Sequence, residues 1–374
     1  MTMLTDLGVD LVSTEPHSSM QGVLDAMRLA PSGGNVQPWD YYVLGDSADC
    51  YLNRDRTSEM DVAHRGSLVA AGAAMYNGEI AANCLTRGAW TEVLPKGPNS
   101  DHLFTIYLGR EGPGDVLPSK YLAMRRRVTN RGVGVRLPFD PSVVEQLDTA
   151  VASADARLRL LTDPASVAEM AEILAASDRI RYMTPLLAEQ MLAELVDDEL
   201  AVGIGLGTLD LSATDLMKLR VVRKPSTLAA LRNVQRAEGR RDFGEALGDN
   251  TRNRVNASSG VAIITMEGSS PADYLYGGYA VEKLLVLAGQ LDIAAQPVSP
   301  VFLYSRTLAE LEHQSFEYYL ELAELRSRFY ELAGLANTEA PILVLRLSHG
   351  VSAPARRSLR LPQDRVVHFG PRQS

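Results

Sequence analysis

The stretch Arg28–Trp39, RLAPSGGNVQPW, is the most informative part of the chain and decides how we interpret the rest. A predicted helix ends here, and proline, serine and two glycines follow it, so several backbone N–H groups are left free of bulky side chains. Asn35 and Gln37 then offer side-chain amides before the chain enters a strand. Such a turn can present donors and acceptors to a flat polar heterocycle. The alternative is a plain helix-ending turn, anchored by a buried Trp39.

Composition predicts a globular protein with a sizeable core. The chain has 374 residues, enough for two domains or one large one, and is 46% apolar and 22% charged. It carries 37 Lys and Arg against 46 Asp and Glu, a net charge of -9. This acidic balance argues against nucleic acid or an anionic membrane as the main partner.

Targeting and metal-binding patterns are not visible in the sequence. The apolar run Gly260–Met266 is too short to span a bilayer, and Met1–Val12 contains two aspartates and no basic residue, unlike a signal peptide. Cys50 and Cys84 form no CxxC motif, which excludes a Cys-rich metal site and a disulfide scaffold. We therefore expect a soluble cytoplasmic protein.

Helices and strands alternate along the chain. The first part predicts a helix over Ser19–Ala30, a strand over Tyr41–Leu44, a helix over Arg65–Arg87 and a strand over His102–Leu108. The long helix is rich in alanine and glycine, which suits close contact with another helix or a sheet, and Gly88 can end it.

A similar order of elements returns in the second part. The predicted helices cover residues 141–150, 163–200, 271–291 and most of 308–335, and the predicted strands cover 156–161, 260–266 and 341–347. A strand, a long helix and another strand therefore occur twice, near residues 41–108 and near 260–347. This predicts an α+β fold with two pseudo-symmetric halves.

Several common catalytic motifs are absent. The sequence contains no GxxxxGK[ST] phosphate loop, no HExxH and no GxSxG. Residues 203–208, GIGLGT, give GxGxG rather than GxGxxG and do not open a clear strand–turn–helix unit, so we do not expect a dinucleotide site there. The six histidines are scattered without ligand spacing and nominate no metal site.

Residues 30–39, APSGGNVQPW, resemble the APSxxNxQPW signature of the nitroreductase superfamily of FMN-dependent oxidoreductases. The resemblance implies an intertwined dimer with each flavin at the subunit interface, where this signature is contributed to a flavin held mainly by the other subunit. It implies that Ser32, Gly33 and Asn35 touch the flavin ring or ribityl chain.

Arg127–Arg131, RVTNR, is similar to the family's RRSxR phosphate-binding start, with threonine in place of serine. Two arginines that flank a hydroxyl at two-residue spacing lie on one side of an extended segment, which suits a terminal phosphate. The resemblance thus assigns Arg127, Thr129 and Arg131 to the FMN phosphate. A solvated basic surface is the alternative.

Ser358–Pro362, SLRLP, resembles the closing K-x-R-L-P element of the family, whose basic residues also face the phosphate. Arg360 keeps the second charge. Ser358 replaces the first, and we expect Arg356 or Arg357 to compensate.

Two further positions follow from the resemblance. Asn250 leads a stretch similar to the family segment in which an asparagine meets the pyrimidine end of the flavin. Leu291–Pro300 is similar to the stretch whose loop donates a backbone N–H to flavin N5. Here Ser299-Pro300 stands where many members have Glu-Gly, and because proline has no N–H, the Ser299 amide is left for this role.

The chain is nearly twice as long as a usual subunit of the family. The resemblance therefore implies an internally fused pair: residues 1–115 carry the QPW segment, and residues 116–374 carry the phosphate cradle. Such a chain is a pseudo-dimer with a flavin site between its halves. It is similar to the double-length branch of the superfamily and to the nitroreductase part joined to adenylating domains of the ubiquitin-activating type, so a homodimer of pseudo-dimers and an adenylating partner are both expected.

The resemblance implies two-electron transfer through flavin N5, between NAD(P)H or an organic donor and a small acceptor. Nitroaromatics and quinones are typical acceptors, and dehydrogenation of a biosynthetic intermediate is the other direction. This chemistry needs neither a metal nor a covalent nucleophile and can take protons from solvent. The basic stretch Lys218–Arg254 predicts either a lid for an anionic substrate or NADPH, or a solvated helical surface. A non-catalytic FMN-binding or flavin-sequestering protein is the alternative function.

Overall fold

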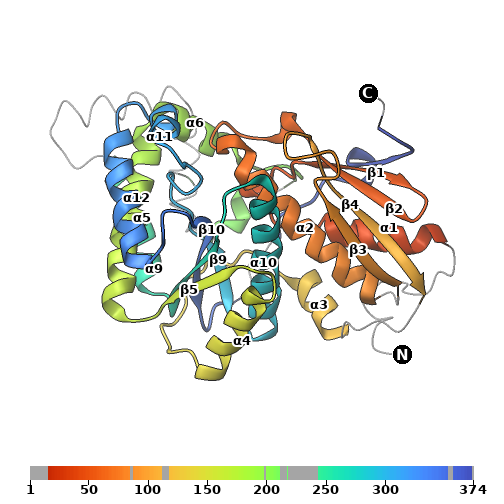
Figure 1. Ribbon diagram of the computed structural model, residues 1–374. Coiled ribbons are helices and arrows are strands. Elements are labelled where there is room, and N and C mark those ends of the chain that lie inside the picture. Colours follow the sequence, from red (N-terminus) through yellow and green to blue (C-terminus); the bar gives the residue numbers. More distant parts are fainter. Residues whose placement is uncertain are drawn as a thin grey trace.

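A computed structural model describes residues 16–84, 87–111, 118–197, 199–210, 217, 243–352 and 357–372. It confirms the predicted α+β class, with a five-stranded and a four-stranded sheet and a long helix beside each (Figure 1). The termini of the described chain lie on the side of the five-stranded sheet (Figure 1). Among these residues, no helix is both long and apolar enough to cross a membrane.

The five-stranded sheet has the order β11-β1-β2-β4-β3. The elements of this part are α1 (Pro16–Met27), β1 (Trp39–Leu44), β2 (Ser47–Leu52), α2 (Arg65–Cys84), β3 (Arg87–Val93), β4 (His102–Glu111), α3 (Pro118–Arg126) and the C-terminal β11 (Val367–Phe369). Strand β11 pairs in parallel with β1, with Tyr41 opposite Val367, whereas the other pairs are antiparallel. The end of the chain therefore returns to the first sheet and carries Arg360 to the end of α1.

The four-stranded sheet has the order β5-β8-β10-β9 and is antiparallel. The elements of this part are α4 (Pro141–Ala152), β5 (Arg157–Leu161), α5 (Pro164–Met183), α6 (Pro185–Ala193), α9 (Phe243–Asn256), β8 (Gly260–Met266), α10 (Pro271–Gln290), β9 (Ala294–Pro297), α11 (Leu308–Gln314), α12 (Tyr319–Ala333) and β10 (Ala340–Ser348). Every residue of β8 is buried. Val261 and Ile263 belong to a core shared with α5 and α12, and Ala262 and Ile264 to a core shared with α2 and α10. A continuous apolar run is typical of a strand covered on both faces.

Helices α2 and α10, of 20 residues each, lie side by side in the middle of the molecule and join the two parts (Figure 1). A Cβ atom at Gly72 would lie 1.8 Å from the carbonyl oxygen of Leu275, and one at Gly278 would lie 2.0 Å from that of Val69. The two backbones therefore touch at a distance that only glycine permits.

Most predicted elements are present, but some boundaries differ. The helix predicted over 65–87 ends at Cys84, and residues 87–93 form β3, whose side chains alternate between half-buried and exposed. The helical region predicted over 163–200 is divided at Pro185, which starts α6, and it ends before the short strand β6 (Leu195–Val196). That strand pairs with β7 (Ile204–Gly205). The division at residue 115 stays a prediction, and β11 shows that the second part also supplies a strand to the first sheet.

Candidate functional site

A cavity of about 500 Å³ lies between the two parts of the chain, within the range of roughly 300–1,000 Å³ that is common for small-molecule and cofactor sites. Segments that are distant in the sequence form its walls. They are the turn at residues 31–36, the first half of α2, residues 124–131, the end of α6, residues 299–301 and residues 357–360.

The structure brings together the predicted site residues with one exception. The cavity is lined by Ser32, Gly33, Asn35, Arg127, Thr129, Arg131, Ser299 and Arg360. Asn250 does not line it: this residue is exposed on α9, and its Oδ1 accepts a hydrogen bond from Nε of Arg254 at 3.2 Å. The arrangement therefore gives no support to the predicted contact of Asn250.

The turn after α1 has the irregular backbone that its residue types favour. Gly34 and Asn35 have φ values of 58° and 54°, the left-handed region that glycine and asparagine tolerate best. Ser32 Oγ accepts a hydrogen bond from the backbone N–H of Gln37 at 3.0 Å. A Cβ at Gly33 would meet no atom within 4 Å, so the turn presents open backbone to the cavity.

The side-chain amide of Asn35 forms its hydrogen bonds with other residues of the chain. Its Nδ2 lies 3.1 Å and 3.0 Å from the carbonyl oxygens of Ala201 and Gly203, and its Oδ1 accepts from Arg360 at 2.9 Å. Gln37 Nε2 donates to the same Ala201 carbonyl at 2.7 Å. Both amides thus hold residues 199–210, here called the cover segment, against the turn. Sequence reasoning missed this partner.

Arg360 binds the end of α1. Its guanidinium donates to the carbonyl oxygens of Arg28 at 3.1 Å and Leu29 at 3.1 Å, the two residues that directly follow α1. Burial, together with the nearby Arg127, lowers the pKa of Arg360 to about 10. This side chain is a half-buried cation whose direct partners are neutral carbonyl and amide oxygens.

Arg127 approaches the same helix end from the other part of the chain. Its Nε forms a buried ion pair of 3.0 Å with Glu282 on α10, and its Nη2 donates to the Leu29 carbonyl at 3.3 Å. Burial raises the pKa of the Glu282 carboxyl, and the Arg127 guanidinium opposes that rise. Arg127 and Arg360 therefore meet at one carbonyl group.

Other guanidinium groups complete this end of the cavity. Arg131 donates to the Thr208 carbonyl at 3.2 Å, and burial with nearby Arg254 lowers its pKa to about 10. Arg357 donates to the carbonyl of Arg125 at 3.1 Å. Six arginines line the cavity, and we call five of them the basic end; they are Arg125, Arg127, Arg131, Arg357 and Arg360, whereas the sixth, Arg181, lies on α5. Arg357 is thus placed to compensate for Ser358, whereas Arg356 lies outside the described residues.

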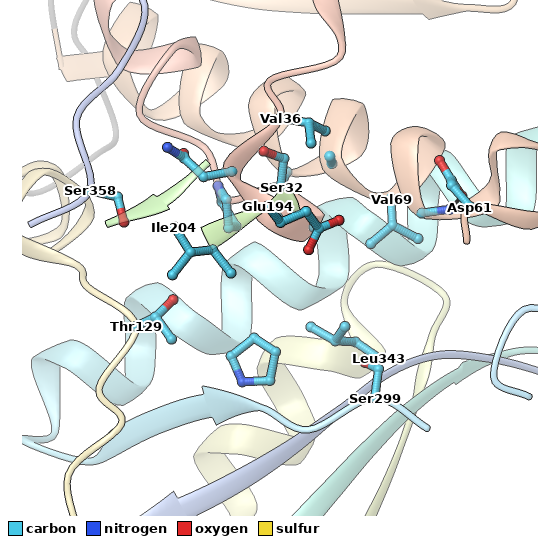
Figure 2. Close-up of a pocket in the computed structure, with 18 of the residues that line it drawn as sticks. Ser32, Val36, Asp61, Val69, Thr129, Glu194, Ile204, Ser299, Leu343 and Ser358 are labelled. Atoms are coloured by element: carbon cyan, nitrogen blue, oxygen red, sulfur yellow. Dashed lines mark hydrogen bonds between the residues drawn. The ribbon is translucent and has the colours of Figure 1, made fainter. Parts of the chain in front are cut away.

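Two carboxyl groups line the rest of the cavity, and the sequence pattern did not reveal them (Figure 2). Asp61 accepts hydrogen bonds from the backbone N–H groups of Gly66 at 2.6 Å and Ser67 at 2.9 Å, at the start of α2. Burial nevertheless raises the pKa of Asp61. Burial also raises the pKa of Glu194 to about 7. Asp61 could have been found as a helix cap, but Glu194 lies in the acidic stretch LAELVDDEL, which looks like a solvated surface.

Ser299 has an unused hydroxyl at the cavity wall. Its Oγ is buried without a hydrogen-bond partner among the described residues, while its carbonyl accepts from Arg181 at 2.7 Å. Within the same described ranges, no three His, Cys, Asp or Glu side chains gather in a way that could hold a metal. Most of the predicted basic lid, residues 218–242, lies outside the described part of the chain.

Comparison with known proteins finds one long relative. No family model matches the chain. It is 37% identical over 351 residues to the uncharacterized protein MT1398 of Mycobacterium tuberculosis (strain CDC 1551 / Oshkosh), which covers 92% of this chain and 48% of the relative. The chain therefore spans about half the length of this relative.

Solved structures similar to the chain are nitroreductases and related FMN-bound proteins. The nitroreductase NfnB of Sphigopyxis sp. strain HMH, described as FMN- and NADPH-dependent, is 13% identical, with 67% of this chain and 99% of that one covered and a TM-score of 0.37. A nitroreductase with bound FMN from Bacteroides fragilis is 10% identical, with 66% and 96% covered and a TM-score of 0.37. With TM-scores this low, the similarities lend no weight to the assignment of function, which depends on the residues of the cavity.

Proposed function

We propose that this chain is an FMN-dependent oxidoreductase of the nitroreductase type, built as a fused pseudo-dimer. One observation carries the proposal: segments that separately resemble the flavin-binding motifs of this family line a single cavity. They are the turn at 32–35, the stretch 127–131 and Arg360. A chance resemblance of three separate motifs would not be expected to converge in space.

The basic end suits a phosphate group. Arg127, Arg357 and Arg360 are donors in charge-assisted hydrogen bonds, which are the strongest that phosphate oxygens accept. Burial and mutual proximity lower the pKa of Arg360, so that a bound anion would relieve an unfavourable accumulation of positive charge. Thr129 and Ser358 add hydroxyl groups at the same end.

The neighbouring wall suits a flat ring system. Val69 and Ala70 of α2 and Leu343 of β10 provide apolar contact, and the Gly33 backbone is unobstructed. The unpaired Ser299 hydroxyl offers a donor or acceptor at the ring edge. When bound here, FMN would supply two-electron transfer, and the chain would supply orientation and exclusion of water.

The remaining space, toward Asp61, Met60 and Met191, is left for a small organic substrate. We propose a nitroaromatic or quinone acceptor with NAD(P)H as donor, or else dehydrogenation of a biosynthetic intermediate. Because the chain matches about half of a longer relative, we also propose that it works beside a further domain, for which an adenylating partner of the ubiquitin-activating type is the candidate. A homodimer of pseudo-dimers in the cytoplasm completes this proposal.

The test is an anaerobic titration of the FMN-loaded chain with NADH and NADPH, monitored through the visible absorbance of the flavin. Bleaching by either nucleotide, and recovery of the colour on adding a quinone, supports the enzyme. A yellow chain that neither nucleotide nor any organic donor bleaches favours the non-catalytic FMN-binding protein. A colourless chain that takes up no FMN contradicts both.

A further inference from the structure

Glu194 occupies a central place in the cavity. It follows the last residue of α6, and its carboxyl points into the space between Ser32 and Leu343 (Figure 2). A Cβ at Gly34 would lie 2.4 Å from Cδ of Glu194, so this carboxyl packs directly on the glycine of the turn. The contact places Glu194 beside the wall to which we assign the flavin ring.

The fold does not use this carboxyl. Among the described residues, no hydrogen bond or ion pair holds the Glu194 side chain, which contrasts with the bonds that Asp61 accepts at the start of α2. Burying an unpaired carboxyl costs stability unless it is protonated, and groups of this kind are common at functional sites.

The charges around Glu194 come from two other elements. Arg181 on α5 faces it, but that guanidinium is tied to Asp178 at 2.7 Å and to the Ser299 carbonyl at 2.7 Å. Asp61, before α2, faces it with a like charge. Burial raises the pKa of Glu194 to about 7, Arg181 opposes the rise and Asp61 adds to it. Tyr304, which also lines the cavity, is neutral near pH 7 because burial raises the pKa of its hydroxyl.

We propose that Glu194 is a catalytic residue that exchanges a proton with the substrate in this cavity. The inference depends on the function proposed above. When bound, reduced FMN would supply two electrons and one hydrogen to a quinone, and the carboxyl of Glu194 would give the second hydrogen as a proton to the other quinone oxygen. The hydroquinone leaves, and the carboxylate takes a proton from water. In dehydrogenation the proton moves in the opposite direction.

The first test needs no cofactor. A carboxyl whose pKa is higher in the folded than in the unfolded chain favours folding while it is protonated, and this contribution is lost as the pH rises through about 7. Glu194→Gln should therefore raise the urea midpoint relative to the parent at pH 8 more than at pH 5. Glu189→Gln, at an exposed position on α6, the helix that Glu194 follows, is the matched control and should show the same difference from the parent at both pH values.

The second test uses the FMN-loaded chain after chemical reduction, with menadione and ferricyanide as acceptors. Glu194→Gln should slow reoxidation by menadione at pH 6 by about 100-fold and abolish the fall in rate that the parent shows as the pH rises through 7. Ferricyanide takes electrons without a proton, so its rate should not change. Glu189→Gln should behave as the parent.

The outcomes separate the two proposals. Equal midpoint differences at pH 5 and pH 8, or a menadione rate and pH profile that Glu194→Gln leaves unchanged, would overturn the role of Glu194 alone. A loss of the ferricyanide rate as large as that of the menadione rate would also overturn it, because the defect would then not concern a proton. A parent chain that takes up no FMN overturns the proposed function and this inference with it.

Discussion

Substituting Gly72 by alanine tests how the two parts of the chain are joined. The new Cβ would lie 1.8 Å from the Leu275 carbonyl oxygen, a backbone atom of α10 that cannot turn aside as a side chain can. Helices α2 and α10 would have to separate by roughly 1 Å or more at this point. Overpacking a core costs about 1–3 kcal/mol, and we expect the upper end here because the clash is between backbones.

The assay is urea unfolding of Gly72→Ala beside Gly289→Ala. Gly289 lies on α10, the helix that Gly72 of α2 contacts, but a Cβ at Gly289 would meet no atom within 4 Å, so alanine there should raise stability by about 0.4–1 kcal/mol through the unfolded chain. Gly72→Ala should instead lower the midpoint, and it should weaken FMN binding because Val69, Ala70 and Ala73 of α2 line the cavity. A midpoint for Gly72→Ala equal to or above that of the parent would refute this account of the helix contact.

Three further substitutions address the site. Asn35→Ala removes one of the two amides that hold the cover segment, so amide hydrogen exchange of residues 199–210 should accelerate by about tenfold. Unchanged exchange would mean that Gln37 and other contacts are enough to hold this segment. Glu282→Ala leaves the buried Arg127 without its counter-ion and should lower the free energy of unfolding by about 3–5 kcal/mol, and a loss below about 1 kcal/mol would contradict a strong pair. Arg360→Ala should weaken FMN binding by about tenfold or more, because charge-assisted hydrogen bonds contribute about 1.5–3 kcal/mol. Binding of riboflavin, which has no phosphate, should stay nearly unchanged. Equal effects on both ligands would show that Arg360 does not bind the phosphate.

Local patterns in the sequence were enough for much of the fold. The apolar run of β8 and the alanine- and glycine-rich pattern of α2 each lie within consecutive residues of the chain. Both elements can therefore be predicted from the sequence. The sequence pattern does not predict strand β3, because its alternately half-buried and exposed residues carry only a weak alternating signal. Strand β11 has three residues and gains its stability from pairing with β1, which no local pattern can reveal.

The site was predictable where it consists of a motif and not where it depends on tertiary contacts. The turn around Asn35 and the arginines near residue 127 were found, and they line one cavity. The partners of Asn35 were missed because Ala201 and Gly203 are far away in the sequence and bind through backbone atoms. Glu194 was missed for a related reason: its acidic stretch is typical of a solvated helix end, and only the fold places its half-buried carboxyl in the cavity.

The most direct measurement of the central claim is the stoichiometry of flavin binding to the full chain. FMN is titrated with the protein, and binding is monitored through the quenching of FMN fluorescence. The account predicts one FMN for each chain, because the motif-bearing segments line a single cavity, and a much weaker affinity for riboflavin, which lacks the phosphate that the basic end would bind. An equal affinity for riboflavin would contradict the role of the basic end. Two FMN molecules per chain, or none, would contradict the single shared site.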